Sequence, residues 1–184
     1  MTTFSNKIKV SNFTLKSVEP AYSNQTWTGQ RIIRSTGIQY YKLNFTLNFN
    51  IKDRAEVDNF LALYSQGKSF QLPLGHLSTF QGNQTGGLVA STAAAKGSRV
   101  ITATNNMGVG ELLQFTNHKK IYRIIDRTAT SLTLFPALQN TLQATETIFY
   151  NNLIIEAVLD PDNDYSMNIE NVTSIQLKAM ENVQ

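Results

Sequence analysis

The sequence predicts a mainly β protein that contains a single α-helix. In "YYKLNFTLNFNI", residues 40–51, apolar and polar residues alternate, which is the pattern of a half-buried β-strand. Directly afterwards, in "KDRAEVDNFLALYSQGKSF", the hydrophobic period changes to that of a helix. Short strand-like runs separated by turn residues fill most of the chain beyond residue 98. These observations favour one domain, or two small ones, built from β-sheets.

Composition is that of a globular chain with its own hydrophobic core. The 184 residues are 41% hydrophobic and 16% charged, and a chain of this length can bury a real core. Cysteine is absent, which excludes a disulfide scaffold and a thiolate metal site. The N-terminus lacks the apolar run of a signal peptide, and no run of about 18 apolar residues predicts a membrane span. We therefore expect a soluble protein with no membrane insertion.

Charge is weak overall but unevenly distributed. The net charge of +3 does not by itself indicate a nucleic-acid partner. Residues 1–74 hold nine Lys and Arg against four Asp and Glu, whereas residues 148–184 hold one against six. Opposite charges of this kind suit segments that fold against each other, although each surface pair contributes little.

The alternating stretch predicts a strand of unusual length. At about 3.4 Å per residue it would extend roughly 40 Å, about twice the usual length of a strand. It should therefore extend beyond the core of a small monomeric domain. The residues of this strand that we single out as candidate site residues are Tyr41, Lys42, Leu43, Asn44, Phe45, Thr46, Leu47 and Asn48.

The helix is predicted over about residues 53–66. Asp53 occupies the N-cap position, with Glu56 three residues later to complete a capping box, and Gly67 can end the helix in the left-handed conformation. One face gathers the apolar residues Val57, Phe60, Leu61 and Tyr64. The following "SFQLPL" predicts a short strand, which Pro73 confines to an edge or ends.

Residues 75–104 are small, polar and glycine-rich, which suits either a flexible linker or the entry into a second domain. The dense run of strands that follows favours the second domain, with strands beginning near Leu88 and Arg99. The spacing predicts a five-strand barrel or small sandwich of about 70 residues. Beyond it, "TIFYNNLIIEAVLD" predicts two strands, "DPDND" a turn, and "YSMNIENVTSIQLKAMENV" a bulged strand pair rather than a helix.

Few residues suggest chemistry. His76 and His118 have no partner at metal-ligand spacing and are expected to be solvated loop residues. Asp160, Asp162 and Asp164 have the alternate spacing that begins a calcium loop, but the glycine and distal glutamate of such a loop are missing. A solvated turn is the expected reading. We predict no catalytic residue, no cofactor and no metal site, and therefore not an enzyme.

The stretch "NHKKIYRIIDR" is the one candidate for a binding face on the barrel. Basic and aromatic side chains on a small barrel can stack on and neutralise a nucleic-acid strand. Strand alternation, however, divides the charges of this stretch between two faces, which disfavours that role. The residues singled out are Phe115, Tyr122 and Arg123, and a carbohydrate-binding alternative would use an aromatic platform drawn from Phe80, Phe115, Tyr122 and Phe135.

The order of parts resembles the distal tail proteins of long-tailed bacteriophages. The matching parts are the strands in "YSNQTWTGQRIIRSTGIQYYKLNFTLNF", the helix in "DRAEVDNFLALYSQGKSFQLPLG", an inserted barrel and a return strand. The short strand after the helix matches at Phe70, Leu72 and Pro73. The insert matches at Tyr122-Arg123-Ile124 and in "LTLFPALQN", where Ala137 and Gln139 replace a common proline and a common arginine.

This resemblance implies a tail-tube-like split barrel formed by residues 1–74 and 148–184, with an oligonucleotide/oligosaccharide-type (OB-like) barrel inserted as residues 75–147. It also implies a homo-hexameric ring in the virion, assembled in the host cytoplasm, which joins the tail tube protein to the tail-tip or baseplate hub. DNA would pass through without sequence-specific contacts. The long strand would lie between subunits, with its polar face towards the lumen, because neighbours in a ring can continue one another's sheets. A host surface glycan is the alternative partner, bound by the inserted barrel as a binding module at the tail tip or baseplate.

Overall fold

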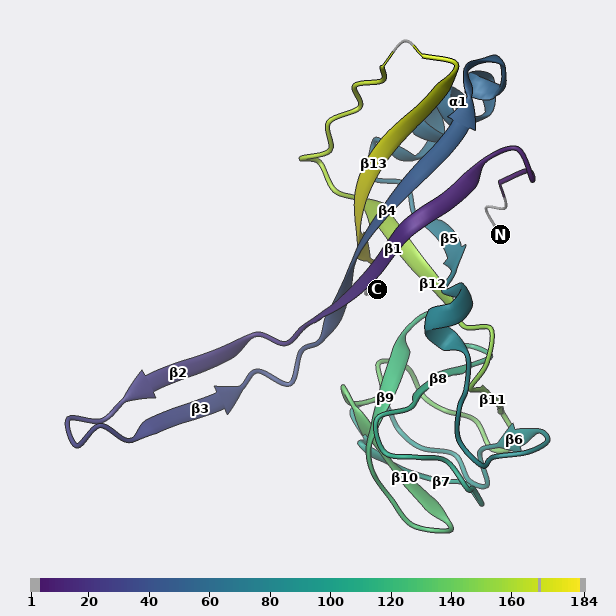
Figure 1. Cartoon of the computed structure of the whole chain (residues 1–184). Coiled ribbons are helices and arrows are strands. Elements are labelled where there is room, and N and C mark those ends of the chain that lie inside the picture. Colours follow the sequence, from purple (N-terminus) through teal and green to yellow (C-terminus); the bar gives the residue numbers. More distant parts are fainter. Residues whose placement is uncertain (1–3, 169, 183–184) are drawn as a thin grey trace. The chain divides into compact units, whose positions relative to one another are not determined.

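The computed structural model describes residues 4–168 and 170–182 (Figure 1). Strands make up 43% of the chain and helices 10%, so the predicted mainly β class with one α-helix is confirmed. Contacts divide the chain into two compact units, residues 1–18, 40–72 and 154–184 in the first and residues 19–39 and 73–153 in the second. None of the helices in the described residues has the length and apolar character that crossing a bilayer requires.

The first unit is built on a five-stranded sheet. Its order is β1 (Lys9–Val18), β4 (Tyr40–Asn50), β13 (Val172–Glu181), β12 (Ile154–Leu159) and β5 (Phe70–Pro73). The predicted long strand is β4, and it is a central strand that pairs antiparallel with both β1 and β13. The strand predicted to end at Pro73 is β5, which lies at the edge of the sheet where a missing backbone N–H is tolerated.

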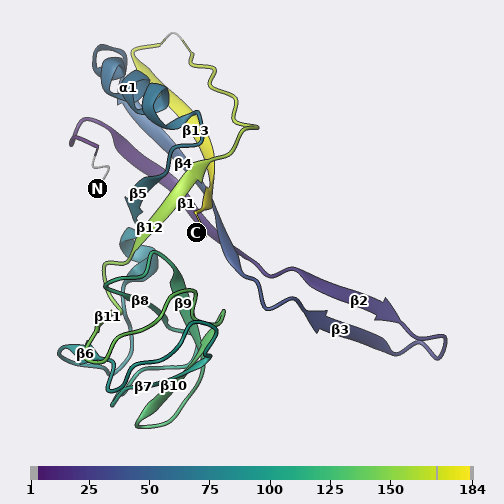
Figure 2. The same cartoon turned by 180° about the vertical axis from the view of Figure 1, so that it is seen from behind.

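One face of this sheet is buried because apolar residues meet in register across its strands. Leu47 lies opposite Ile175, and Phe45 lies opposite Leu177, with all four side chains at most 1% exposed. The α-helix α1 (Arg54–Tyr64) packs on the same core through Phe60, whose ring lies 5.3 Å from that of Phe70. Figure 2 shows α1 beside this sheet.

The start of α1 differs from the predicted capping box. A short 3₁₀ helix, η1 (Ile51–Asp53), precedes it, and Asp53 makes no side-chain cap hydrogen bond. Glu56 instead accepts hydrogen bonds from the backbone N–H and hydroxyl of Ser5, both at 2.7 Å. The carboxylate therefore holds the N-terminal segment against the helix, and a distant donor replaces the local one. The helix ends before Gly67, whose φ of +84° is in the left-handed region as predicted.

The second unit contains a curled six-stranded sheet. Its order is β6 (Leu88–Val89), β11 (Thr147–Phe149), β8 (Leu112–Phe115), β9 (Ile121–Arg127), β10 (Ser131–Phe135) and β7 (Val100–Thr102). The two ends approach each other, because the N–H of Ser91 after β6 donates to the carbonyl of Thr102 in β7 at 2.7 Å. The prediction of five strands misses β11, which joins this sheet although the predicted insert ends at its first residue, Thr147.

Residues 160–168 and 170–182 contain a single strand, which corrects the predicted strand pair. A turn closes at Asp160, whose carbonyl accepts the N–H of Asn163 at 3.2 Å, and residues 164–168, 170 and 171 are irregular. The single strand β13 then buries Thr173, Ile175 and Leu177 on its inner face. Val172, predicted with the apolar set, is 62% exposed. Ile169 lies outside the described residues. The second unit also contains the short 3₁₀ helix η2 (Gly75–Ser78).

Candidate assembly surfaces

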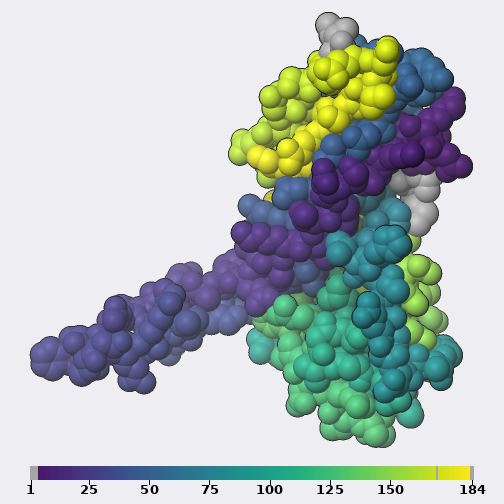
Figure 3. All heavy atoms as spheres, viewed as in Figure 1, coloured from purple at the N-terminus to yellow at the C-terminus, as the bar shows by residue number. Residues whose placement is uncertain are grey.

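A two-stranded ribbon, residues 21–35, is the most exposed part of the second unit. It consists of β2 (Ala21–Gln25) and β3 (Arg31–Ser35), paired antiparallel, and every residue of both strands is exposed. Figure 3 shows its side chains at the surface. A two-stranded hairpin alone is at best marginally stable in water. The ribbon therefore has the character of an element completed by a partner.

Apolar residues lie on both faces of the ribbon. The pairing of Tyr22 with Arg34 and of Asn24 with Ile32 places these four side chains on one face, and Ile33 lies on the other. The exposed fractions are 76% for Tyr22, 49% for Ile32 and 60% for Ile33. Residues 20–38 contain Arg31 and Arg34 but no acidic residue.

The tip of the ribbon holds a fully exposed tryptophan, Trp27, in an ordered turn. The N–H of Thr26 donates to the carbonyl of Gln30 at 2.8 Å, and the N–H of Gly29 donates to the carbonyl of Thr26 at 2.9 Å. Gly29 has a φ of +87°, which a residue with a side chain adopts only with strain. The turn therefore has an ordered backbone, and the indole at its tip is fully exposed.

The first unit carries a complementary feature, which we call the β13 trough. Its floor is the solvent face of the five-stranded sheet, with Thr46 of β4 and Ser174, Gln176 and Lys178 of β13. Its wall is formed by residues 160–168, 170 and 171. One hollow is lined by these four side chains with Asp162, Asn163, Asp164 and Ser166, and a second is lined by Ile51, Glu170, Asn171 and Val172. The second is a shallow depression of about 680 Å³ that opens widely to solvent.

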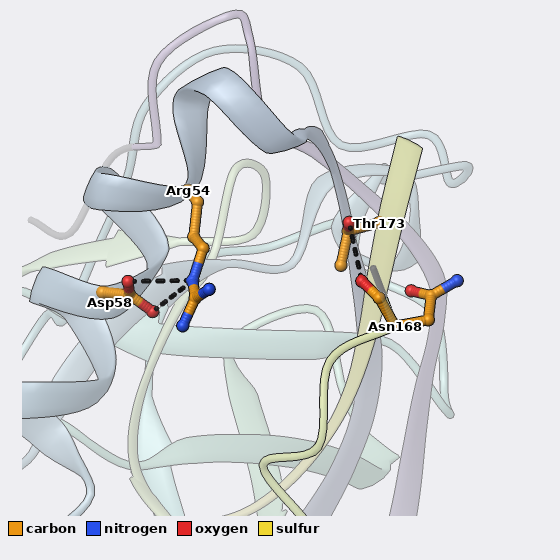
Figure 4. Close-up of polar contacts among 4 residues, drawn as sticks. All are labelled: Arg54, Asp58, Asn168 and Thr173. Atoms are coloured by element: carbon orange, nitrogen blue, oxygen red, sulfur yellow. Dashed lines mark hydrogen bonds and ion pairs between the residues drawn. The ribbon is translucent and has the colours of Figure 1, made fainter. Parts of the chain in front are cut away.

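Two side chains hold the loop wall against β13. Asn163 makes two hydrogen bonds to the backbone of Lys178, in the way that a neighbouring strand would. Its amide nitrogen donates to the carbonyl of Lys178 at 2.7 Å, and its amide oxygen accepts the N–H of Lys178 at 2.6 Å. The hydroxyl of Thr173 donates to the carbonyl of Asn168 at 3.3 Å (Figure 4). It also contacts the carbonyl of Glu170 at 3.3 Å. These contacts hold residues 163, 168 and 170 against β13.

The long strand β4 lies inside its own sheet. Tyr41, Leu43, Phe45 and Leu47 are buried in the core of the chain itself, while Lys42, Asn44, Thr46 and Asn48 are on the solvent face. Both edges of β4 are paired within the chain, so it has no edge for a neighbouring subunit. The predicted position of β4 between subunits and beside a lumen therefore stays a prediction, and β1 and β5 are the strands at the edges of this sheet.

The predicted binding face of the barrel is not a surface. Phe115 and Tyr122 are 1% and 0% exposed, because strand alternation directs them into the core of the six-stranded sheet. A bulge at Ile125 of β9, opposite the step from Thr133 to Leu134 of β10, leaves Ile125 without a register partner. Phe115 and Tyr122 come before this bulge in the chain, so it does not affect them. Their choice as a binding face rested on residue type, which does not report exposure.

Arg123 faces outward, but its guanidinium already contacts Glu19 and Phe135. Its guanidinium lies 2.6 Å from a carboxylate oxygen of Glu19 and 5.8 Å from the centre of the Phe135 ring. Glu19 directly precedes the ribbon, so this ion pair ties the base of the ribbon to β9. Arg123 therefore positions the ribbon, and the role predicted for it in ligand binding is not supported by these contacts.

His118 is buried, which corrects the prediction of a solvated loop residue. It is 4% exposed, its Nδ1 lies 3.0 Å from the Tyr122 hydroxyl, and that hydroxyl also accepts the N–H of Gln139 at 3.1 Å. Burial lowers the pKa of His118 from its ordinary value of 6.5, while the charge of Glu146 and a contact to the Thr141 backbone act in the opposite direction. His76, in contrast, is exposed as predicted.

The acidic residues of the 160–164 turn are not gathered as a metal site. Within residues 4–168 and 170–182, no group of three or more His, Asp or Glu side chains is placed to hold a metal ion. Asp164 accepts the N–H and the hydroxyl of Ser166 at 3.0 and 3.1 Å, which is a local turn contact. The expected solvated turn agrees with these contacts.

No protein-family model matches the chain, and no curated protein matches its sequence. The functional residues that sequence reasoning missed are the exposed side chains of the ribbon. The signal was present in "NQTWTGQ", where one tryptophan stands among turn-forming polar residues, but the sequence does not state whether such a turn is covered.

Proposed function

We propose that this protein is a structural virion component of a bacteriophage tail, which forms a ring at the distal end between the tail tube and the tail tip. The observation that carries the proposal is the ribbon of residues 21–35, which exposes Tyr22, Trp27, Ile32 and Ile33 while burying none of them on its own chain. Exposed apolar surface of this kind marks a protein interface. It supports an assembly role, and the resemblance to distal tail proteins supplies the kind of assembly.

The solvent face of the five-stranded sheet supports the same role. On β4 this face carries Lys42 and Asn44, which leave a polar surface outside the lining of the β13 trough. Such a surface suits a water-filled channel through which DNA passes without base-specific contacts. The edge strand β1 is left for pairing with a neighbour, and its register against β4 shifts between Ser11 and Thr14.

The proposed partners are further copies of this chain, the tail tube protein on one side and the hub of the tail tip or baseplate on the other. The proposed location is the virion, after assembly in the bacterial cytoplasm. No catalytic step is proposed. Glycan binding by the barrel is not favoured by any observation, because Phe115 and Tyr122 are core residues and Phe135 packs beside Arg123.

Light scattering over a range of protein concentrations tests the proposal. A mass six times that of the 20.6 kDa chain is expected, either at once or on concentration, together with rings that have a central opening in electron micrographs. A chain that remains monomeric at every concentration, and forms no ring by microscopy, would contradict it.

A further inference from the structure

We propose that the ribbon of one copy docks in the β13 trough of the next copy, with Trp27 in the hollow between Ile51 and Val172. The inference rests on the proposed function, since it assigns the contact through which copies associate. It joins two exposed features of the described residues, the ribbon and the β13 trough. The occupant of the trough is then a second copy of this chain, on the grounds of charge and apolar complementarity.

Charge complementarity identifies the trough as the partner of the ribbon. The ribbon carries Arg31 and Arg34 with no acidic residue between positions 20 and 38. The loop wall of the trough carries Asp162, Asp164 and Glu170, all exposed, and a single basic side chain, Lys178, lies on the floor. Neither arginine of the ribbon makes an ion pair among the residues that the structure describes. Arg34 lies on the face with Tyr22 and Ile32, and Arg31 lies on the opposite face. A close approach of the Arg34 face would pair Arg34 with the acidic wall, and Arg31 would add longer-range attraction.

Apolar complementarity fixes the direction of docking. The hollow at one end of the trough combines the exposed side chains of Ile51, at 37%, and Val172, at 62%, with the carboxylate of Glu170. An aromatic anchor in an apolar pocket is the usual centre of a tight interface. Trp27 is the most exposed large apolar side chain among the described residues, and it lies at the ribbon tip. The tip therefore belongs at the Val172 end.

The spacing of the two surfaces agrees with this direction. From Val172 to Gln176, β13 extends about 14 Å, at about 3.4 Å per residue. Three or four residues along β3 separate the tip from Arg34, which is a similar length. Trp27 at Val172 therefore places Arg34 near Asp162. The face with Tyr22, Asn24, Ile32 and Arg34 is itself hollowed and would lie on the trough.

A charge-swap mixture tests the contact. The ribbon variant carries Arg31→Glu and Arg34→Glu, and the trough variant carries Asp162→Lys and Glu170→Lys. Among the described residues, neither of these two carboxylates accepts a hydrogen bond that holds the loop. Each variant alone should lose assembly, because like charges then face each other. The equimolar mixture should recover it, because an alternating ring restores attraction at every contact. The matched control, Lys96→Glu with Arg127→Glu on the exposed barrel, changes net charge as the ribbon variant does and should assemble like the wild type.

Crosslinking between copies tests the position of the tip. The chain contains no cysteine, so single cysteines report without background. One copy with Thr28→Cys and another with Asn171→Cys should give a crosslinked dimer with a short bis-maleimide when mixed. Thr28→Cys mixed with Thr130→Cys, on a barrel turn, should not. Trp27→Ala should raise the apparent Kd of assembly roughly thirtyfold, as loss of a central aromatic anchor does.

The outcomes separate this inference from the proposed function. A wild type that assembles while both charge variants assemble equally well, or a tip that crosslinks to the barrel control instead, would overturn the docking and leave the ring intact. A wild type that stays monomeric in scattering and gives no crosslink at any concentration would overturn both. Loss of assembly in the variants is counted only where circular dichroism and thermal unfolding match the wild type.

Discussion

His118 connects two loops at one end of the six-stranded sheet. The turn of residues 116–120 carries its ring, and the Tyr122 hydroxyl links that ring to the backbone of Gln139 in the connection after β10. Glu146 ties the same two segments, since its carboxylate accepts the N–H of Asn117 at 2.8 Å and the N–H of Gln143 at 3.0 Å. A neutral imidazole suits this site, because protonation would place a charge in the core.

The stability of the chain should therefore fall in mild acid. The pKa of His118 is lower in the folded chain than its unfolded value of 6.5, so the unfolded chain binds the proton first. The contribution is fully present above the unfolded pKa and is lost as the pH falls from there towards the folded pKa. Urea unfolding at about pH 7.5 and about pH 5 measures it. In His118→Gln, the part of the acid-induced loss of stability that comes from His118 should be absent. A variant whose stability has the same pH profile as the wild type would contradict this role of His118.

Phe60 decides the packing of α1 on its sheet. Its ring is 4% exposed and lies within 5.3 Å of the rings of Phe4, Tyr64 and Phe70. Phe60→Ala should lower the free energy of unfolding by about 3–5 kcal/mol, the usual range for a buried phenylalanine. Leu63→Ala, on the exposed side of the same helix, should change it by less than about 0.5 kcal/mol. Denaturant titration of the two variants compares them, and equal effects would show that the buried face is misassigned.

Among the elements, the ribbon differs from the rest in what it contributes to folding. The strands of both larger sheets bury apolar faces, whereas β2 and β3 bury none, and their pairing is held by backbone hydrogen bonds and the Glu19–Arg123 ion pair. Elements with little buried apolar surface contribute little to global stability. Their retention in a folded chain indicates a role in binding.

A chain whose residues 22–34 are replaced by a short Gly/Ser turn should thus keep its thermal unfolding midpoint within a few degrees of the wild type. Its association should be lost, because the proposed contact is removed. Differential scanning calorimetry and light scattering on the same sample measure the two properties. A large fall in the midpoint would show that the ribbon supports the fold, and it would count against the separation of folding from assembly.

At the scale of the whole molecule, the charge of the chain predicts a salt-sensitive association. Surface charges separated by more than about 10 Å are largely screened at 0.1 M salt, so the ribbon–trough contact should weaken as salt rises from about 0.05 to about 0.5 M. The salt dependence of association should be shallower for Arg34→Glu mixed with the wild type than for the wild type alone. Association that strengthens with salt throughout would point to a purely apolar contact instead.

The elements were largely accessible from the sequence because each rests on a local pattern. Strict alternation placed β4, the change of period placed α1, and Pro73 placed the end of an edge strand, all as observed. Glu56 failed as a cap because its partner, Ser5, is 51 residues away in sequence. The sequence pattern did not reveal the bulge at Ile125 of β9, since alternation cannot register an added residue.

The sequence by itself determined the mainly β class, the single helix, the absence of cysteine chemistry and the opposite charges of the outer segments. Only the tertiary structure decided which of the patterned residues are covered. It buried His118, Phe115 and Tyr122, placed β4 between two strands of its own chain, and left Trp27 uncovered at a turn. The physical reason is that hydrophobic period fixes the local conformation of a segment, whereas exposure depends on contacts between residues far apart in the chain.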